Sequence, residues 1–364
     1  MILFFRVSLF FVFIFQGVTS FAGVRELRTL YRSGKLRGMG GARITNATGE
    51  DAIFANPALM AENENVHFYP LISDTEGSAD IINSASTALT AFSSFSADSI
   101  NALLGKNIQG RAQVASALTI PNVGVSLLVD GQFAFYSNNP ALPSTTLGYQ
   151  TTSGVQLSWG MSFHGNTRRN RRNHEFLFGL GAKLLYRRGG YYDLDSIGLL
   201  ELTTQQKNKL SPLVGNFESG YGGDLGLIHV WRPNKTFTLR SGTAWTDIGN
   251  TTFGGRAEPV LNNLGVGVSA KFDYGWWGMN FAWDFSHLLS TTDFRKKNHF
   301  GMSFDLPIIS LMAGVNQTYL TYGFELDFLF FKVAMTSYGE ELAETSFSDS
   351  DRRYLLRMVF DLSL

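Results

Sequence analysis

Apolar and polar side chains alternate with a period of two along much of this chain, and the last residues show the pattern most clearly. One face of the C-terminal stretch carries apolar residues, namely Tyr354, Leu356, Met358, Phe360, Leu362 and Leu364. Arg357, Asp361 and Ser363 lie between them, together with Leu355 and Val359. Because successive side chains of a strand point to opposite faces, this stretch is predicted to be a strand with one apolar and one polar face.

The same alternation recurs upstream, for example over residues 155–163, 264–272, 277–285 and 320–328. Residues that favour turns separate the alternating stretches. The fold class predicted from this pattern is all-β, with fourteen strands over residues 65–73, 110–120, 122–136, 147–163, 175–190, 221–232, 236–247, 262–272, 276–286, 298–306, 308–316, 319–328, 330–338 and 352–364.

The predicted connections differ in length between the two ends of the sheet. Those at one end are mostly tight, as at Pro121-Asn122 and Leu306-Pro307, although residues 165–174 form a longer, basic exception. Short periplasmic turns and long outer loops are typical of outer-membrane antiparallel β-barrels. The connections assigned to the outer side cover residues 74–109, 191–220, 248–261 and 339–351.

Charges of both signs fall on the polar face of the strands, and two architectures would accommodate them. A soluble sandwich places this face in water, whereas a membrane barrel places it in the lumen and turns the apolar face to lipid. The N-terminal leader, the large aromatic residues and the connection lengths favour the barrel. The candidate lumen charges are Lys183, Arg187, Asp224, Arg240, Lys271, Asp284, Asp305, Glu325, Asp327, Lys332, Arg357 and Asp361.

Residues 1–22 have the features of a secretory signal peptide. Arg6 is their only charge, residues 7–15 are apolar, and the small residues Ser20 and Ala22 lie near the expected cleavage site. A retained membrane anchor is the alternative, but the apolar run is short for the ~20 residues that a helical span requires. We therefore expect secretion of the mature chain into a Gram-negative-type envelope.

Composition excludes several kinds of site. The chain has no cysteine, which removes disulfides and thiolate metal sites, and its 30 basic and 30 acidic residues give no sign of nucleic-acid binding. The acids near His229, His287 and His299 belong to the general lining of the strands. We therefore expect no enzyme activity, no catalytic residues, no metal and no cofactor.

Residues 23–63 precede the barrel, which is expected to span residues 64–364. Gly38, Gly40 and Gly41 permit tight backbone turns, and Pro57 restricts the residue before it to extended conformations. This segment has a suitable length for a plug inside the barrel, and a disordered periplasmic tail is the alternative. Its basic residues Arg25, Arg28, Arg32, Lys35, Arg37 and Arg43 have possible partners in Asp284, Asp305, Glu325 and Asp327.

Three short motifs in this segment resemble the long-chain fatty acid outer-membrane transporter (FadL-like) family. They are Gly38-Met39-Gly40-Gly41-Ala42, Glu50-Asp51-Ala52-Ile53-Phe54 and Asn56-Pro57-Ala58. Residues 299–342 resemble a wider branch that includes secretion-associated barrels. The resemblance implies a fourteen-stranded barrel with an N-terminal plug, whose motif residues here would be Gly38, Gly40, Gly41, Asn56, Pro57 and Ala58. Branches of the family carry fatty acids, carry aromatic hydrocarbons or assist protein export, so the resemblance leaves the substrate open.

Two outer loops, residues 79–105 and 196–210, are predicted to be partly helical. In the first, Leu89, Phe92 and Phe95 lie on an apolar stripe. This stripe is a candidate ligand-capture site, and the alternative is that it packs across the barrel mouth. The lumen charges likewise have two interpretations. In the first, they pair with one another and with the plug. In the second, one of the basic residues binds a ligand carboxylate.

These patterns predict a monomeric outer-membrane barrel for passive uptake of hydrophobic small molecules such as long-chain fatty acids. The alternative is an envelope scaffold or secretion-accessory barrel that binds another protein. The expected partners are membrane lipid, a hydrophobic small-molecule ligand and the outer-membrane assembly machinery, with no nucleic acid among them.

Overall fold

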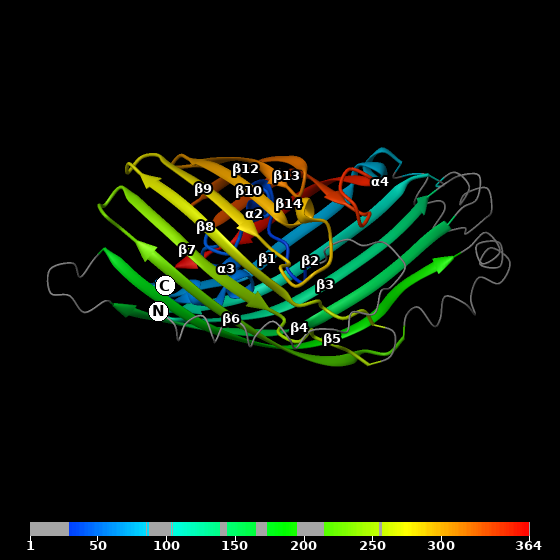
Figure 1. The fold of residues 1–364 in the computed structure, drawn as a ribbon, viewed down its shortest axis with the longest axis horizontal. Coiled ribbons are helices and arrows are strands. Elements are labelled where there is room, and N and C mark those ends of the chain that lie inside the picture. The colour runs from blue at the N-terminus through cyan, green and yellow to red at the C-terminus, as the bar shows by residue number, and fades with distance from the viewer. Residues whose placement is uncertain are drawn as a thin grey trace, which may run out of the picture.

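The computed structural model describes residues 29–84, 86, 103, 105–138, 144–164, 173–194, 215–254 and 257–363. Fourteen antiparallel strands form one closed sheet, and Figure 1 shows how they surround the interior. The strands are β1 (His67–Ser78), β2 (Asn107–Ile120), β3 (Val123–Asn138), β4 (Ser144–His164), β5 (His174–Leu194), β6 (Glu218–Trp231), β7 (Phe237–Thr246), β8 (Asn263–Asp273), β9 (Gly278–Phe285), β10 (Asn298–Asp305), β11 (Ile309–Asn316), β12 (Tyr319–Phe328), β13 (Phe331–Glu341) and β14 (Ser350–Phe360). A two-residue strand, β15 (Leu362–Ser363), continues β14.

The barrel closes because its last strand pairs with its first. β14 pairs with β13 on one side and with β1 on the other, where Ile72 lies opposite Val359. β15 extends this pairing to His67 and Phe68. Each of the fourteen strands therefore has two neighbours, and the sheet has no open edge at which another chain could add a strand.

The distribution of exposed and buried side chains is the reverse of that in a soluble protein. Outward-facing Leu157 and Phe300 are 46% and 48% exposed, whereas Arg353 and Arg357 on the inner face are 0% and 2% exposed. Large apolar side chains so widely exposed are stable only against an apolar solvent. The outer face therefore meets lipid, and the charges line the interior.

The two ends of the barrel follow from the strand order. The N-terminus of β1 and the C-terminus of β14 lie at the same end, together with the tight turns at 121–122, 232–236, 306–308 and 329–330. We assign this end to the periplasm and the opposite end to the outside. The wall is uneven in height, because β4 and β5 have 21 residues each while β9, β10 and β11 have 8 each.

Residues 29–62, which we call the N-terminal segment, fill the barrel interior (Figure 1). They form α2 (Gly34–Gly38), α3 (Glu50–Ala55) and a 3-10 helix, η2 (Pro57–Glu62). The segment contacts the inner face of all fourteen strands. It begins towards the outer side, where the Leu30 carbonyl accepts a hydrogen bond from Arg111, and ends on the periplasmic side, where Glu62 meets Arg240.

The prediction of a fourteen-stranded antiparallel barrel is confirmed. The first strand was predicted to end at residue 73, which is wrong, because it continues to Ser78, whose hydroxyl caps the short helix α4 (Ala79–Asn83). A second short helix, η3 (Phe294–Lys297), lies in the loop after β9. The predicted signal peptide, the capture residues Leu89, Phe92 and Phe95, and the loop 196–210 lie outside the described residues. Within the described ranges, no helix is long and apolar enough to cross a bilayer.

Arginine at Phe281 should destabilise the barrel, because this side chain faces lipid near the middle of β9. It packs against Phe272 on the outer surface, with the two ring centroids 6.4 Å apart. We expect Phe281→Arg to lower the free energy of unfolding by about 2–4 kcal/mol, measured by urea titration of the protein refolded into vesicles. Asn280→Ala, on the inner face, is the control and should be mild. The inside–outside assignment fails if Asn280→Ala is the more damaging of the two.

Candidate functional site

Helix η2 lies directly on a stripe of three glycines in the barrel wall. Gly160, Gly179 and Gly226 are register partners on β4, β5 and β6. A Cβ atom at Gly179 would lie 2.2 Å from the amide nitrogen of Ala58, and one at Gly226 would lie 1.9 Å from Oδ1 of Asn56. Only glycine leaves room for so close an approach. The Asn-Pro-Ala motif therefore rests where the wall carries no side chains.

Asn56 fixes the start of η2. Its Oδ1 accepts a hydrogen bond from the Ala58 amide at 3.1 Å, and its Nδ2 donates to the Ile44 carbonyl at 2.8 Å. Pro57 occupies the first position of the helix, where its missing N–H would have no helical partner. The fully buried Asn56 side chain thus connects η2 to the preceding turn.

The glycine-rich motif makes a second close contact with the wall. Gly40 has φ +66°, a left-handed conformation, and a Cβ atom there would lie 2.1 Å from the Phe300 carbonyl oxygen. The Thr321 hydroxyl accepts from the Gly40 amide at 3.1 Å and donates to the Gly38 carbonyl at 3.0 Å. The Gly41 backbone, also left-handed, faces His299 on β10. The motif therefore holds the segment against β10 and β12.

Arg357 connects the N-terminal segment to the closing strands. Its guanidinium donates to Glu50 at 2.6 Å, to Asp51 at 2.8 Å and to Asp74 at 2.9 Å. The Tyr31 hydroxyl, 3.0 Å from the same guanidinium, donates to Asp51 at 2.7 Å. One buried cation thus compensates carboxylates from α3 and from β1. Buried charges require such partners because their desolvation is otherwise very costly.

Other basic residues of the segment pair around the lumen. Lys35 binds Glu325 at 3.1 Å, and this carboxylate raises the pKa of Lys35 above its ordinary value. Arg37 binds Glu340 at 3.3 Å. Arg32 binds Glu76 at 2.6 Å rather than any of the four acids predicted as partners. Arg25 and Arg28 lie outside the described residues.

The predicted lumen charges on the long strands lie deep in the interior. Lys183 Nζ lies 2.9 Å from Asp224 and 3.0 Å from Asp247. Arg187 donates to the Thr152 hydroxyl at 2.9 Å and to the Glu258 carbonyl at 2.8 Å. Both basic side chains therefore hold the loop after β7 against the wall.

The remaining predicted charges occupy varied positions. Arg240 binds Glu62 at 3.0 Å on the periplasmic side. Asp284 on β9 faces the barrel interior. Its Oδ2 accepts hydrogen bonds from the backbone amides of Arg43 and Ile44 at 2.6 and 2.8 Å. Its partner is therefore the backbone of the N-terminal segment and not an arginine side chain.

Five further predicted charges lie towards the periplasmic rim, among them Asp361, which binds Lys332 at 3.1 Å. Lys271 is 3.8 Å from Asp273, Asp327 is 3.6 Å from Lys332, and Asp305 accepts from Ser303 at 3.1 Å. The Lys271 and Asp327 side chains are each 45% exposed. Neither belongs to the buried network of the lumen.

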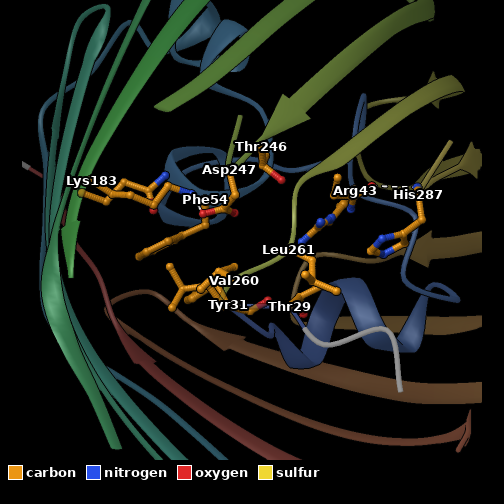
Figure 2. Close-up of a pocket in the computed structure, with 13 residues that line it drawn as sticks. Thr29, Tyr31, Arg43, Phe54, Lys183, Thr246, Asp247, Val260, Leu261 and His287 are labelled. Atoms are coloured by element: carbon orange, nitrogen blue, oxygen red, sulfur yellow. Dashed lines mark hydrogen bonds and ion pairs between the residues drawn. The ribbon is translucent and has the colours of Figure 1, made fainter. Parts of the chain in front are cut away.

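A cavity lies between the N-terminal segment and the outer ends of β7–β9. It has about 340 Å³ of space that is partly open to solvent, and its walls include Phe54, Val260 and Leu261 together with Arg43 and His287 (Figure 2). A second cavity of about 540 Å³ adjoins it through shared residues. The enclosed part of each of these two cavities has room for only a few water molecules.

Arg43 is the notable group in these cavities. In Figure 2 its side chain extends into the first cavity, towards Leu261. Its guanidinium makes no ion pair or hydrogen bond with any residue that the structure describes. Burial, followed by the charge of Arg37, lowers the pKa of Arg43 from its ordinary value. Burial also lowers the pKa of His287, which keeps that ring neutral. The cavity thus combines a few apolar side chains with polar ones, among them Lys183 and Asp247, and with a guanidinium that no described carboxylate binds directly.

Sequence reasoning missed several buried charges on the first strands. Asp74 and Glu76 on β1, Arg111 on β2 and Asp130 on β3 all face the lumen, and Arg111 binds Asp130 at 2.6 Å. Asp74, Glu76 and Ser78 alternate with Thr75 and Gly77, a pattern that could have extended the predicted strand. Among the described residues, no group of three or more potential ligands could hold a metal ion.

Comparison with known proteins finds similar folds among solved structures. No protein-family model and no curated protein matches the sequence. A deltaS2S3 mutant of the monoaromatic hydrocarbon channel TodX aligns with 91% of this chain and 98% of its own, at 13% identity and a TM-score of 0.49. The Ralstonia pickettii toluene transporter TbuX aligns with 90% of this chain and 97% of its own, at 11% identity and a TM-score of 0.45. CdiB from Acinetobacter baumannii aligns with 82% of this chain and 60% of its own, at 9% identity and a TM-score of 0.34.

The location of the protein follows from its own geometry. Every strand is paired, the outer face is apolar and exposed, and the charges are buried inside. A closed barrel of this kind satisfies its backbone hydrogen bonds within lipid. Tight turns lie at one end, and most of the longer connections lie at the other. The chain is an outer-membrane β-barrel of fourteen strands.

Proposed function

We propose that this barrel takes up hydrophobic small molecules passively, with a preference for those that carry a carboxylate, as long-chain fatty acids do. The observation that carries the proposal is the outer-side cavity, where the Arg43 guanidinium makes no ion pair or hydrogen bond with a described residue and lies beside apolar Phe54 and Leu261. A guanidinium without a direct ion-pair partner favours an anionic group, and a carboxylate can accept two of its hydrogen bonds. The apolar walls would receive the start of the hydrocarbon chain.

Passage beyond the cavity requires the N-terminal segment to shift, because the segment contacts every strand and leaves only small spaces. We therefore infer that the segment acts as a movable plug. The polar contacts on its outer side would exchange with the ligand, while the glycine stripe under η2 offers a surface with few side chains to obstruct sliding.

The experiment measures uptake of a labelled long-chain fatty acid and of its methyl ester into vesicles that contain the purified barrel. Arg43→Gln should lower uptake of the acid several-fold and leave uptake of the ester unchanged. Lys271→Gln is the matched control, since this cation lies at the rim, outside the cavity. Equal effects of Arg43→Gln on acid and ester would contradict the role of the cation.

A second function, an envelope scaffold that binds another protein, is favoured by a different observation. Most of the lumen is polar, and several buried ion pairs hold the N-terminal segment in it, as expected of a static interior. Wild-type vesicles that take up neither acid nor ester above protein-free vesicles would put this second function first.

A further inference from the structure

The periplasmic turns of the barrel differ in character between its two sides. On the side of the short strands, three turns expose large apolar residues, which are Tyr274, Trp276, Ile308, Leu329 and Phe330. On the side of the long strands, the turn between β6 and β7 is polar, with the sequence Arg232-Pro233-Asn234-Lys235. Turns in water are ordinarily polar, so the apolar set needs an explanation.

The three apolar turns are neighbours along the periplasmic rim, and we call their exposed side chains the apolar patch. They join β8 to β9, β10 to β11 and β12 to β13, and these six strands are consecutive in the sheet. The patch continues the lipid-facing surface, since Trp277 stacks with Tyr274 at 4.5 Å between ring centroids and contacts Phe304 at 5.9 Å. The turn at 274–277 therefore adjoins the part of the wall that meets the membrane.

Leu329 carries the strongest signal. It is 94% exposed, and its φ of +43° is in the left-handed region, where glycine or asparagine is favoured. A leucine at this position is unfavourable both for the backbone and for contact with water. An apolar environment around the turn would remove the second of these costs.

The strand lengths explain why the turns would meet lipid on this side. A strand of 8 residues rises ~3.3 Å per residue, and at a tilt of ~40° it advances about 20 Å along the membrane normal, less than the ~25 Å apolar band of such barrels. β9 follows the turn at 274–277, and β10 and β11 flank the turn at 306–308; all three have this length. β12 and β13, which flank the turn at 329–330, have 10 and 11 residues and just span the band, so that turn lies at its edge. β4 and β5, at 21 residues, extend well beyond the band.

We propose that the turns at 274–277, 306–308 and 329–330 are inserted into the periplasmic leaflet of the bilayer. Their aromatic and aliphatic side chains complete the apolar band that the short strands leave incomplete, and tryptophan at 276 lies in the interfacial layer that this residue prefers. The bilayer beside β9–β11 is correspondingly thinner than beside β4 and β5. This inference is independent of what the barrel transports.

The test uses single cysteines, because the natural chain has none. Leu329→Cys carries an environment-sensitive fluorophore, and Lys235→Cys, in the exposed polar turn after β6, is the matched control. Both proteins are reconstituted into phosphatidylcholine vesicles that contain a lipid quencher near the headgroup end of the acyl chains. We expect blue-shifted emission and several-fold stronger lipid quenching at position 329, and stronger iodide quenching at position 235.

Equal iodide quenching at both positions, with no lipid quenching at 329, would overturn the proposal. If a partner protein covers the patch instead of lipid, purified vesicles would give this same result. Position 329 would then be protected from iodide only in native envelopes. Because Leu329 has a left-handed backbone, Ile308→Cys gives a second, independent reading of the same patch. Quenching by lipid at 308 is expected, and its absence there also counts against the proposal.

Discussion

Replacing Arg357 by alanine should lower the free energy of unfolding by about 3–5 kcal/mol, the usual cost of removing one partner from a buried ion pair. The change leaves Glu50, Asp51 and Asp74 buried without their shared cation. These carboxylates come from both the N-terminal segment and β1, so the segment should also detach from the wall. Urea unfolding in vesicles measures the stability, and protease sensitivity of residues 29–62 reports the detachment.

Arg352→Ala is the matched control for this prediction. Arg352 lies on the same strand but donates to Ser337 and to the Leu320 carbonyl near the outer rim. Surface contacts of this kind contribute about 0–1 kcal/mol. Equal losses of stability in the two variants would show that the buried network does not hold the segment.

Deletion of residues 24–61 should leave a barrel that still assembles but conducts small solutes freely. The strands close on one another without the segment, since β14 pairs directly with β1. The lumen charges would then be solvated rather than buried. We expect permeability to sugars to rise from near that of protein-free vesicles to a porin-like rate, measured by liposome swelling.

Gly131→Ala is a control for this deletion, because a Cβ there would contact nothing within 4 Å and the segment remains in place. Its swelling rate should equal that of the wild type. An assembled deletion variant with unchanged permeability would mean that the segment does not occlude the pore.

The strands could be predicted from sequence because lipid and lumen impose opposite chemistry on alternate residues. In β9, Phe281 and Trp283 face outwards while Asp284 faces the segment, and this contrast is visible in the sequence itself. The first strand was cut short because its outer half, from Asp74 to Ser78, has no large apolar residue on either face. Alternation that lacks an apolar face carries a weaker signal.

The partners within the lumen could not be predicted in the same way. Lys35 binds Glu325 as charge alone suggests, but Arg37 binds Glu340, and Arg43 meets Asp284 through its backbone amide while its guanidinium pairs with no described acid. The closure of the sheet in three dimensions decides which strand faces each residue of the segment. The sequence pattern alone does not reveal these pairings. The glycine stripe of Gly160, Gly179 and Gly226 is likewise visible only when the strand register is known.

The central claim is that hydrophobic molecules pass only when the N-terminal segment moves, and a reversible tether tests it most directly. An ideal Cβ at Gly38 lies 3.1 Å from the Cβ of Met312 on β11, somewhat closer than the ~3.5–4.5 Å of a disulfide, so a small shift of the segment accommodates the bond. With no native cysteine, Gly38→Cys with Met312→Cys forms one defined crosslink, and each single variant serves as a control.

The measurement is uptake of a labelled long-chain fatty acid into vesicles that contain the double-cysteine variant, before and after reduction. We predict that the oxidised protein takes up little more than protein-free vesicles, and that reduction restores the rate of the single-cysteine controls. Equal uptake in the oxidised and reduced states would contradict the account, because the ligand would then pass a segment that cannot move.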